Sequence, residues 1–386
     1  MAKRTAKATE SVLSVEDDLT SLIAQSLNKQ FKSSHAKVAY TLDEDTSSDI
    51  TNWVSTGSSI LDLAISNRPN GGFPVGRITE ITGMEQSGKS LLAAHALANT
   101  QKMGGIAVLI DSESAISKEF LQAIGVDLKT LIYIPLELIE EVFEAIENIV
   151  NYLISNNIKD KIITIVVDSV AGTSTKQEME ADYDKDGWAT SKAIILSKAM
   201  RKVTNFVSKS NICLIMTNQL RTKMSVTFGD NMTTSGGKAV AYHSSVRLRL
   251  ASAGQIKVKI DGREEIVGAT TRAKVIKNRC GPPLRTADYD IYYDSGIDDY
   301  GQWLVTLRDR KLVTESGNSY IYTVKSTGEE IKFTSKKLKT LLNSNPEFRA
   351  SMYDDICEAL ITKYKAGEDF GIDDVTITTD EPGEES

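Results

Sequence analysis

The chain has 386 residues, a formal net charge of −7 and only three cysteines and three histidines. It has neither an apolar run long enough to span a bilayer nor the apolar N-terminal segment of a secretory signal, so we expect no membrane association. The cysteines (Cys213, Cys280 and Cys357) make no C-x-x-C or Cys/His ligand spacing, which disfavours zinc and disulfide chemistry and indicates a cytoplasmic, reducing compartment.

In chain order, a polar N-terminal attachment with one helical patch, "LTSLIAQSLNKQF", is expected over residues 1–50. Strands and helices then alternate. Strands are predicted at residues 76–83, 106–113, 131–136, 162–170 and 212–219, with helices at 89–103, 118–125, 138–155 and 191–211, and with further strands at 244–253, 255–261, 272–279 and 287–293. Apolar strands separated by helices predict an α/β fold with a largely parallel central sheet and a later antiparallel edge.

The C-terminal part of the chain differs from this alternating region. Residues 300–367 mix strand and helix patterns and end in a helical stretch, so we expect a second, small α+β domain there. Residues 368–386 carry eight carboxylates and no lysine or arginine, which predicts a disordered acidic tail.

The segment "TEITGMEQSGKSLLAA", residues 79–94, has the G-x-x-x-x-G-K-[ST] spacing of a phosphate-binding P-loop. Glycines let the backbone wrap a triphosphate, so that N–H groups and a helix N-terminus face its oxygens. Lys89 would reach the β- and γ-phosphates, and the Ser90 hydroxyl would face Mg²⁺. A plain glycine turn is the alternative, but the flanking strand and helix favour nucleotide. The predicted contacts are Gly83, Met84, Glu85, Gln86, Ser87, Gly88, Lys89 and Ser90.

Polar side chains follow three other apolar strands. Asp168 ends "IITIVVD", as a carboxylate that holds Mg²⁺ through water would, although an aspartate there can also cap a turn. Asp111 and Glu113 end another strand, where an acid can polarise the water that attacks a γ-phosphate. Gln219 follows a third strand and could sense that phosphate. Because parallel strands present their carboxyl ends at one edge, we expect these residues to lie together.

Three runs carry a resemblance to a known family: "STGSSILDLAISNRPNGGFPVGRITEITGMEQSGKS", "NQLRTKMSVTFGDNMTTSGGKAVAYHSSVRLRL" and "AKVIKNRCGPPLRTADYDIYYDSGI". They are similar to the RecA family of ATP-dependent DNA recombinases, over roughly residues 25–300 and more loosely beyond. The resemblance implies a RecA-type P-loop ATPase core at residues 51–299, an oligomerisation role for residues 1–50, and ATP with Mg²⁺ as cofactors.

The resemblance also assigns roles at the nucleotide site. Glu113 matches the catalytic carboxylate and Gln219 the γ-phosphate sensor. Lys277 and Arg279 match two basic residues that a neighbouring subunit presents to the γ-phosphate. The remaining matches are Phe120, at a position where the family stacks an aromatic on adenine, and Tyr293, a second aromatic that reaches the base across the interface.

The loop of residues 221–238 mixes basic, apolar and paired glycine residues, so cations can meet phosphates while backbone amides approach them. Arg201 matches a basic residue below the family's first DNA loop. The expected DNA contacts are Arg201, Arg221, Lys223, Gly236, Gly237 and Lys238. The partners implied are single- and double-stranded DNA, further copies of the chain in a helical filament, a single-strand-binding protein and a loader.

Some positions depart from the family pattern. Ile194 replaces an arginine, Ala241 replaces a lysine and Tyr242 stands where an interface phenylalanine is expected, which suggests a phage-encoded relative. Three functions stay open: an ATPase that pairs and exchanges homologous DNA strands, a nucleotide-gated DNA-binding or regulatory oligomer without strand exchange, and a helicase-like motor. The basic, glycine-paired loop favours the first.

Overall fold

The computed structural model describes residues 19–31, 39–40, 49–114, 116–180, 188–222, 232–234 and 236–364. The predicted acidic tail, Lys223 and most of the predicted DNA loop of residues 221–238 lie outside this range. No helix within it is long and apolar enough to cross a membrane.

The described residues form a central ten-stranded sheet. Nine strands follow the order β12-β11-β10-β9-β3-β7-β6-β4-β5, and the tenth, β8, pairs with β7 outside this order. Its parallel strands are β3 (Ile78–Gly83), β4 (Ile106–Asp111), β5 (Leu131–Pro135), β6 (Ile163–Asp168), β7 (Ile212–Thr222) and β9 (Val246–Ile260). The antiparallel pairs are made by β8 (Met232–Thr234), β10 (Arg263–Asn278), β11 (Thr286–Tyr292) and β12 (Gly296–Asp298). The largely parallel sheet with an antiparallel edge is confirmed.

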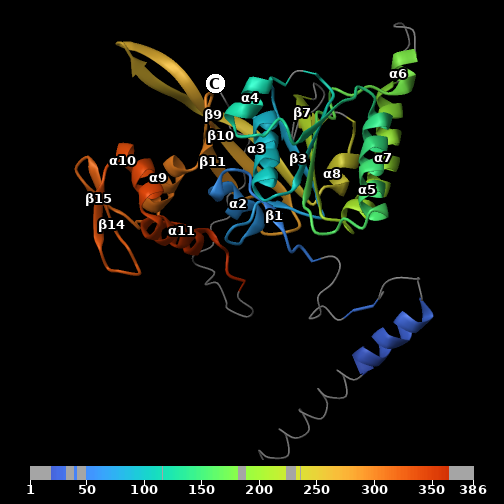
Figure 1. Ribbon diagram of the computed structural model, residues 1–386, viewed down its shortest axis with the longest axis horizontal. Helices are drawn as coiled ribbons and strands as arrows, with labels where there is room; N and C mark the ends of the chain where they lie inside the picture. The colour runs from blue at the N-terminus through green and yellow to red at the C-terminus, as the bar shows by residue number, and fades with distance from the viewer. Residues whose placement is uncertain are drawn as a thin grey trace, which may run out of the picture.

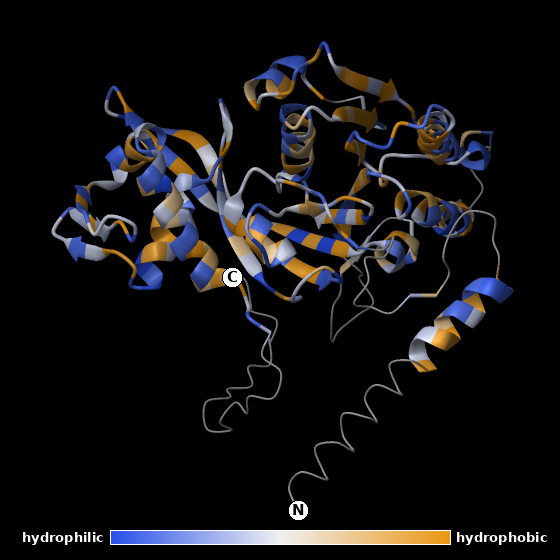
Figure 2. Ribbon diagram, turned by 60° about the horizontal axis from the view of Figure 1, so that its bottom comes forward, coloured by the Kyte–Doolittle hydropathy of each residue, from blue (hydrophilic) through white to orange (hydrophobic). Residues whose placement is uncertain are grey.

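Helices cover both faces of this sheet (Figure 1). One face carries α2 (Ser59–Ser66), α3 (Lys89–Lys102) and α4 (Lys118–Ala123), and the other carries α5 (Ile139–Ser155), α7 (Trp188–Val207) and α8 (Ala239–His243), with the short α6 (Lys176–Glu180) before α7. Strand β4 shows why: Ala107 and Leu109 belong to one hydrophobic core, and Val108 and Ile110 to the other. Figure 2 shows hydrophobic residues on the strands of the sheet with polar ones between them in several strands.

Smaller units flank the sheet. A short pair, β1 (Trp53–Val54) and β2 (Phe73–Pro74), precedes β3; the C-terminal elements are α9 (Tyr300–Asp309), β13 (Thr314–Ser316), β14 (Ser319–Thr323), β15 (Glu330–Phe333), α10 (Ser335–Ser344) and α11 (Pro346–Leu360). The half-buried Asp299 carboxylate accepts hydrogen bonds from the Ser59 backbone N–H at 2.8 Å and from the Trp303 indole at 3.1 Å. This contact fixes the start of the C-terminal unit to α2.

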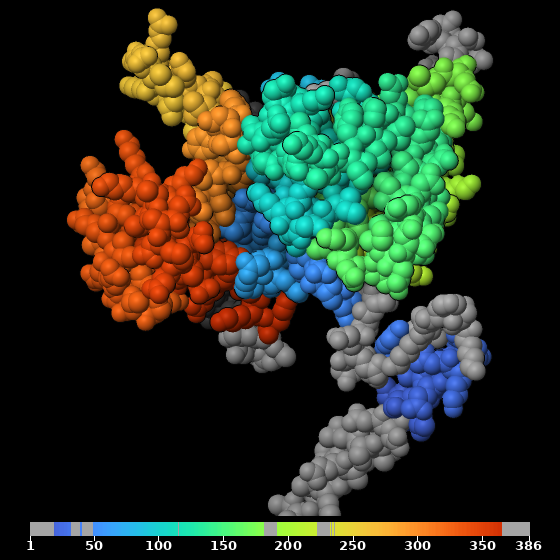
Figure 3. Space-filling model, viewed as in Figure 1, coloured from blue at the N-terminus to red at the C-terminus, as the bar shows by residue number. Residues whose placement is uncertain are grey.

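One sequence prediction was wrong in the antiparallel region. The break expected near Gly254 is absent, and β9 continues to Ile260 as one strand of a long hairpin with β10. Asp261 and Gly262 have φ of 50° and 80°, the positive pair that a two-residue hairpin turn requires. Register shifts in β10 show that the ribbon accommodates irregularities as bulges. The hairpin stands out from the molecular surface (Figure 3).

Candidate nucleotide site and DNA surface

The P-loop joins the fully buried strand β3 to helix α3. Gln86 and Gly88 have φ of 59° and 88°, so the loop turns through the left-handed region just before the helix begins. A Cβ on Gly83 would lie 2.2 Å from Ser87 Oγ, so only glycine fits at the start of the loop. A turn of this kind directs backbone N–H groups and a helix N-terminus toward one point, which is an anion-binding arrangement.

Lys89 lies across this loop. Its Nζ donates to the Met84 carbonyl at 2.6 Å. Burial lowers the pKa of Lys89, while the carboxylates of Asp168, Glu113 and Glu85 raise it. The ammonium therefore stands among several negative groups at the place where a phosphate would enter.

A cavity of about 250 Å³ opens beside Lys89, lined by Ser90, Asp111, Glu113, Ile116, Ser117, Phe120 and Asp168. The structure thus brings together both predicted Mg²⁺ ligands, the predicted catalytic carboxylate and the predicted adenine-stacking ring. Burial raises the pKa of Asp168, hydrogen bonds from Thr217 and Ser90 lower it, and the charges of Glu113 and Asp111 raise it. The Ser90 hydroxyl and the Asp168 carboxylate, which line the same cavity, are oxygen groups of the kind that Mg²⁺ prefers.

Asp111 and Glu113 follow the same strand, and the family resemblance selected Glu113 as the catalytic carboxylate; the two side chains have different surroundings. Asp111 Oδ1 accepts the backbone N–H groups of Glu113 at 3.0 Å and Ser114 at 2.9 Å, and its Oδ2 accepts the Tyr133 hydroxyl at 3.1 Å. Asp111 therefore builds the turn. Glu113 Oε1 accepts one hydrogen bond, from the Ser169 hydroxyl at 2.7 Å, and its side chain faces the cavity.

Gln219 lies directly beside the P-loop, because β7 pairs it with Gly83. Its Nε2 donates to Glu85 Oε1 at 2.8 Å. Two residues later the same strand reaches Arg221, which pairs with β8 at the start of the predicted DNA loop. One side chain therefore joins the nucleotide loop to the strand that enters the DNA loop.

The two predicted adenine contacts lie at the same edge of the sheet as the P-loop. Phe120 belongs to α4, which the Ser117 hydroxyl caps by accepting the Phe120 N–H at 3.1 Å. Tyr293 follows β11 and is 60% exposed. Two residues earlier, Ile291 lies 3.0 Å from the position of a Cβ built on Gly88, which places the end of β11 beside the chain's own P-loop.

Lys277 and Arg279 lie at the amino ends of the parallel strands, whereas the P-loop lies at their carboxyl ends. Strand β10 runs antiparallel to β9, so its last residues approach the amino end of β3: the Arg279 N–H donates to the Ser245 carbonyl, and the Ser245 N–H donates to the Ile78 carbonyl. The structure therefore does not bring these two basic residues to the P-loop of their own chain.

The Lys277 ammonium has its own partners within the chain. It donates to the carbonyls of Ala241 at 2.9 Å and Tyr242 at 2.8 Å, in α8. Burial lowers its pKa to about 8, and the charges of Arg279 and Arg247 add to the lowering. Lys277, Arg279 and Arg247 lie close together and repel one another, and a bound phosphate would reduce that repulsion.

The described part of the predicted DNA surface gathers around α7. Arg201 on that helix, Arg221 at the end of β7 and Lys238 before α8 are exposed. Gly236 has φ of 78°, and a Cβ there would lie 2.3 Å from Leu196 Cδ1 of α7, so glycine is required where the loop returns to the helix. Gly237, with φ of 76°, continues the same turn, and Lys223 lies outside the described residues.

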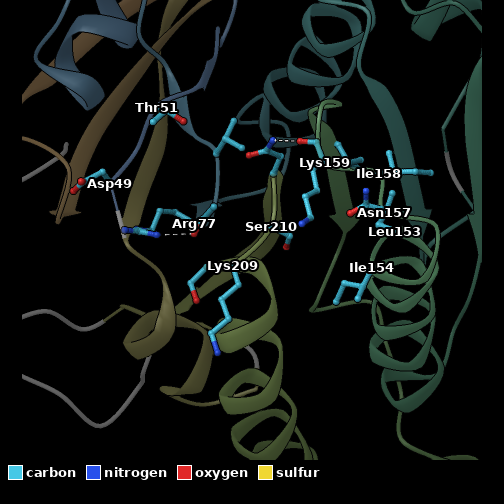
Figure 4. Close-up of a pocket in the computed structure, with 15 residues that line it drawn as sticks. Asp49, Thr51, Arg77, Leu153, Ile154, Asn157, Ile158, Lys159, Lys209 and Ser210 are labelled. Atoms are coloured by element: carbon cyan, nitrogen blue, oxygen red, sulfur yellow. Dashed lines mark hydrogen bonds between the residues drawn. The ribbon is translucent and has the colours of Figure 1, made fainter. Parts of the chain in front are cut away.

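Within the described ranges, no three or more His, Cys, Asp or Glu side chains form a group that could hold a metal ion. A separate cavity of about 570 Å³ lies at the amino ends of β3 and β6, where Arg77, Lys159 and Lys209 line it (Figure 4). It is at the edge opposite to the P-loop, and it contains none of the predicted site residues.

Sequence reasoning missed several residues that position the site. The hydroxyl of Thr217 donates to Asp168 at 2.5 Å, and Ser169 holds Glu113. Lys192 of α7 is buried, although its type suggested an exposed position. The available signal was its helical spacing from the other buried residues of α7, namely Leu196, Met200, Val203 and Val207.

The chain is similar to known proteins over most of its length. The family model described as RecA N-terminal domain matches residues 21–298. The chain is 38% identical over 294 residues to "Protein RecA" of Chlorobaculum tepidum, covering 75% of this chain and 81% of the relative.

Two further relatives are also called "Protein RecA". That of Leptospira meyeri is 39% identical over 306 residues, which cover 79% of this chain and 74% of the relative. That of Chloroherpeton thalassium is 35% identical over 364 residues, 94% of this chain and 96% of the relative. With a family match over most of the chain and relatives that span its length, the chain belongs to the RecA family of DNA recombinases.

Proposed function

We propose that ATP and Mg²⁺ drive the recombinase activity of this protein through the residues around Lys89. As a member of the RecA family, the protein is a DNA-dependent P-loop ATPase that forms filaments on DNA and exchanges homologous strands. Family membership favours this activity over the nucleotide-gated oligomer without strand exchange. The observation that supports the coupling of ATP to DNA is the hydrogen bond from Gln219 to Glu85, which connects the P-loop to the DNA-loop strand.

The side chains in and around the cavity have distinct parts in the proposed hydrolysis. Lys89 pairs with the β- and γ-phosphates, and Glu113, held by Ser169, accepts a proton from the attacking water. Ser90 and Asp168 would hold Mg²⁺, which would offset the charge of the phosphates. Phe120 and Tyr293 provide aromatic surface for the base.

The proposed filament places the ATP of one subunit against Lys277 and Arg279 of the next. These residues lie at the amino ends of the parallel strands, and the P-loop lies at the carboxyl ends. Subunits that stack with the amino ends of one sheet against the carboxyl ends of the next would bring Lys277 and Arg279 to the neighbouring P-loop. Residues 19–30 form a helix whose exposed apolar side chains are Leu19, Leu22, Ile23 and Leu27, with Phe31 just after it. We expect this apolar face to be covered by a second copy of the chain, as an oligomerisation segment would be.

The remaining partners and the cellular location of the protein are predictions. Single- and double-stranded DNA would contact the basic residues around α7, and a single-strand-binding protein and a loader would assist assembly. A cytoplasmic location, within a host cell if the gene is carried by a phage, fits this function. The division into an N-terminal segment, a core, a C-terminal domain and an acidic tail is proposed on the same basis.

Gln219→Ala is expected to bind ATP as before but to lose most of the rise in DNA affinity that ATP causes. The change removes the amide that joins Glu85 to β7, so the coupling between the two sites should fall by about tenfold. DNA affinity should be measured with and without a non-hydrolysable ATP analogue. Gln302→Ala is the control, because it removes a part-buried glutamine of α9. A full ATP effect in the Gln219 variant would contradict the proposed coupling.

Lys277→Ala alone should hydrolyse ATP slowly, because the γ-phosphate of the neighbouring subunit loses a cation; a loss of about a hundredfold is expected. Mixing this variant with Lys89→Ala subunits should restore part of the DNA-stimulated rate. In a mixed filament, an intact P-loop on one subunit can meet an intact Lys277 on the next. If the mixture never exceeds the summed rates of its components, the two residues act within one chain.

A further inference from the structure

Lys192 is a buried lysine of α7 that the proposed mechanism does not use. Its side chain lies within the protein at 6% exposure, and its Nζ donates to the backbone carbonyls of Thr173 and, at 3.5 Å, Ala171. Burial lowers the pKa of Lys192, and Glu178 raises it. Burying an ammonium is costly unless it satisfies polar groups, so these two carbonyl contacts indicate a specific structural task.

The two carbonyls flank Gly172, which lies against the catalytic carboxylate. A Cβ on Gly172 would be 2.7 Å from Glu113 Cγ, so any other residue would push Glu113 out of place. The Gly172 N–H donates to Ser169 Oγ at 3.1 Å, and the Ser169 hydroxyl donates to Glu113 Oε1 at 2.7 Å. Because Ser169 accepts from Gly172, its own hydrogen is directed to Glu113.

Close to Lys192, α7 also contacts the end of the DNA loop. Gly237 packs on the residue next to Lys192, since a Cβ on Gly237 would lie 3.4 Å from Ala193 Cβ. Leu196, one turn further, contacts Gly236, and Arg201 extends from the same helix. Helix α7 therefore contacts the DNA loop through Ala193 and Leu196. It contacts the segment of residues 171–173, which packs against Glu113, through Lys192.

We infer that Lys192 is a positioning residue that couples the DNA-binding surface to Glu113 within one chain. When DNA binds the loop that packs on α7, a shift of the helix moves the carbonyls on either side of Gly172. Gly172 and Ser169 then move the Glu113 carboxylate relative to the water that attacks ATP. This inference rests on the proposed DNA-stimulated hydrolysis and adds the route by which DNA stimulates it.

The first test is Lys192→Met, which keeps the length of the side chain and removes the donor. With saturating single-stranded DNA, kcat for ATP should fall by at least about tenfold while KM for ATP changes by less than about twofold. DNA affinity in the presence of a non-hydrolysable ATP analogue should also stay within about twofold, because no DNA contact is removed. Lys192→Gln, which keeps an N–H donor, should recover part of the rate.

Lys202→Met provides the matched control, because Lys202 is an exposed lysine on the same helix whose ammonium pairs with Glu147 of α5. It should keep the DNA-stimulated rate of the unmodified protein. A loss of equal size in both variants would mean that charge on α7, rather than the Lys192 contacts, carries the effect, and it would overturn the inference.

Ser169→Ala tests the other end of the route without changing α7. If Lys192 acts through Ser169, each single variant should lose most of the DNA stimulation and the double variant should lose little more. Full stimulation in either variant, or losses that multiply, would overturn the inference. If the unmodified protein shows no DNA stimulation, the proposed function fails; if it does and Lys192→Met matches it, only the inference fails.

Discussion

Lys89→Ala is expected to abolish tight ATP binding. The ammonium bridges the P-loop through the Met84 carbonyl and is the cation that Asp168, Glu113 and Glu85 surround. Without it the site presents carboxylates to an anionic ligand, so repulsion replaces attraction. Charge-assisted hydrogen bonds contribute about 1.5–3 kcal/mol each, and the lost pairing with two phosphates should raise the ATP Kd by at least about a hundredfold.

The measurement is equilibrium binding of ATP to the variant, with Lys102→Ala as the control. Lys102 ends the same helix α3 and is exposed, so its removal takes away the same charge without touching the loop. Lys102→Ala should bind ATP normally. An unchanged ATP affinity in Lys89→Ala would mean that the P-loop assignment is wrong.

Glu113→Gln is expected to bind ATP and DNA but to hydrolyse ATP about a hundredfold to ten-thousandfold more slowly, the range that general-base catalysis covers. The amide keeps the size of the side chain and can still accept the hydrogen bond from Ser169. It cannot take a proton from water. The change also removes one negative charge near Asp168, so ATP affinity should not fall.

Single-turnover hydrolysis of ATP separates this chemical step from binding and product release. Glu144→Gln on α5 is a suitable control, because it removes an exposed carboxylate that does not line the cavity. Hydrolysis by Glu113→Gln at the rate of the unmodified protein would place the catalytic base elsewhere.

The nucleotide site was largely predictable because its chemistry is local in sequence. The P-loop spacing fixes the glycines and Lys89, and strand ends in a parallel sheet gather at one edge, so Asp168 and Glu113 could be expected beside it. Strand position alone could not separate Asp111 from Glu113, since both follow one strand, and only the family resemblance selected Glu113. Their roles differ through the turn hydrogen bonds that Asp111 accepts.

The other features depend on contacts between distant segments. The edge on which Lys277 lies follows from the reversal of β10 against β9, and that pairing depends on a hairpin that the sequence divided at Gly254. The position of Lys192 depends on carbonyls that follow β6, nineteen to twenty-one residues earlier. Periodicity could mark Lys192 as a buried position of α7, but not identify its partners.

The central claim is that DNA binding controls ATP hydrolysis in a filament of this protein. The most direct measurement is the steady-state ATPase rate with and without single-stranded DNA, with electron microscopy of the same samples. We expect a rate that rises severalfold or more with DNA, together with helical filaments that form on DNA when ATP is present. A rate that DNA does not change, with nucleotide-dependent oligomers that form equally well without DNA, would contradict the account.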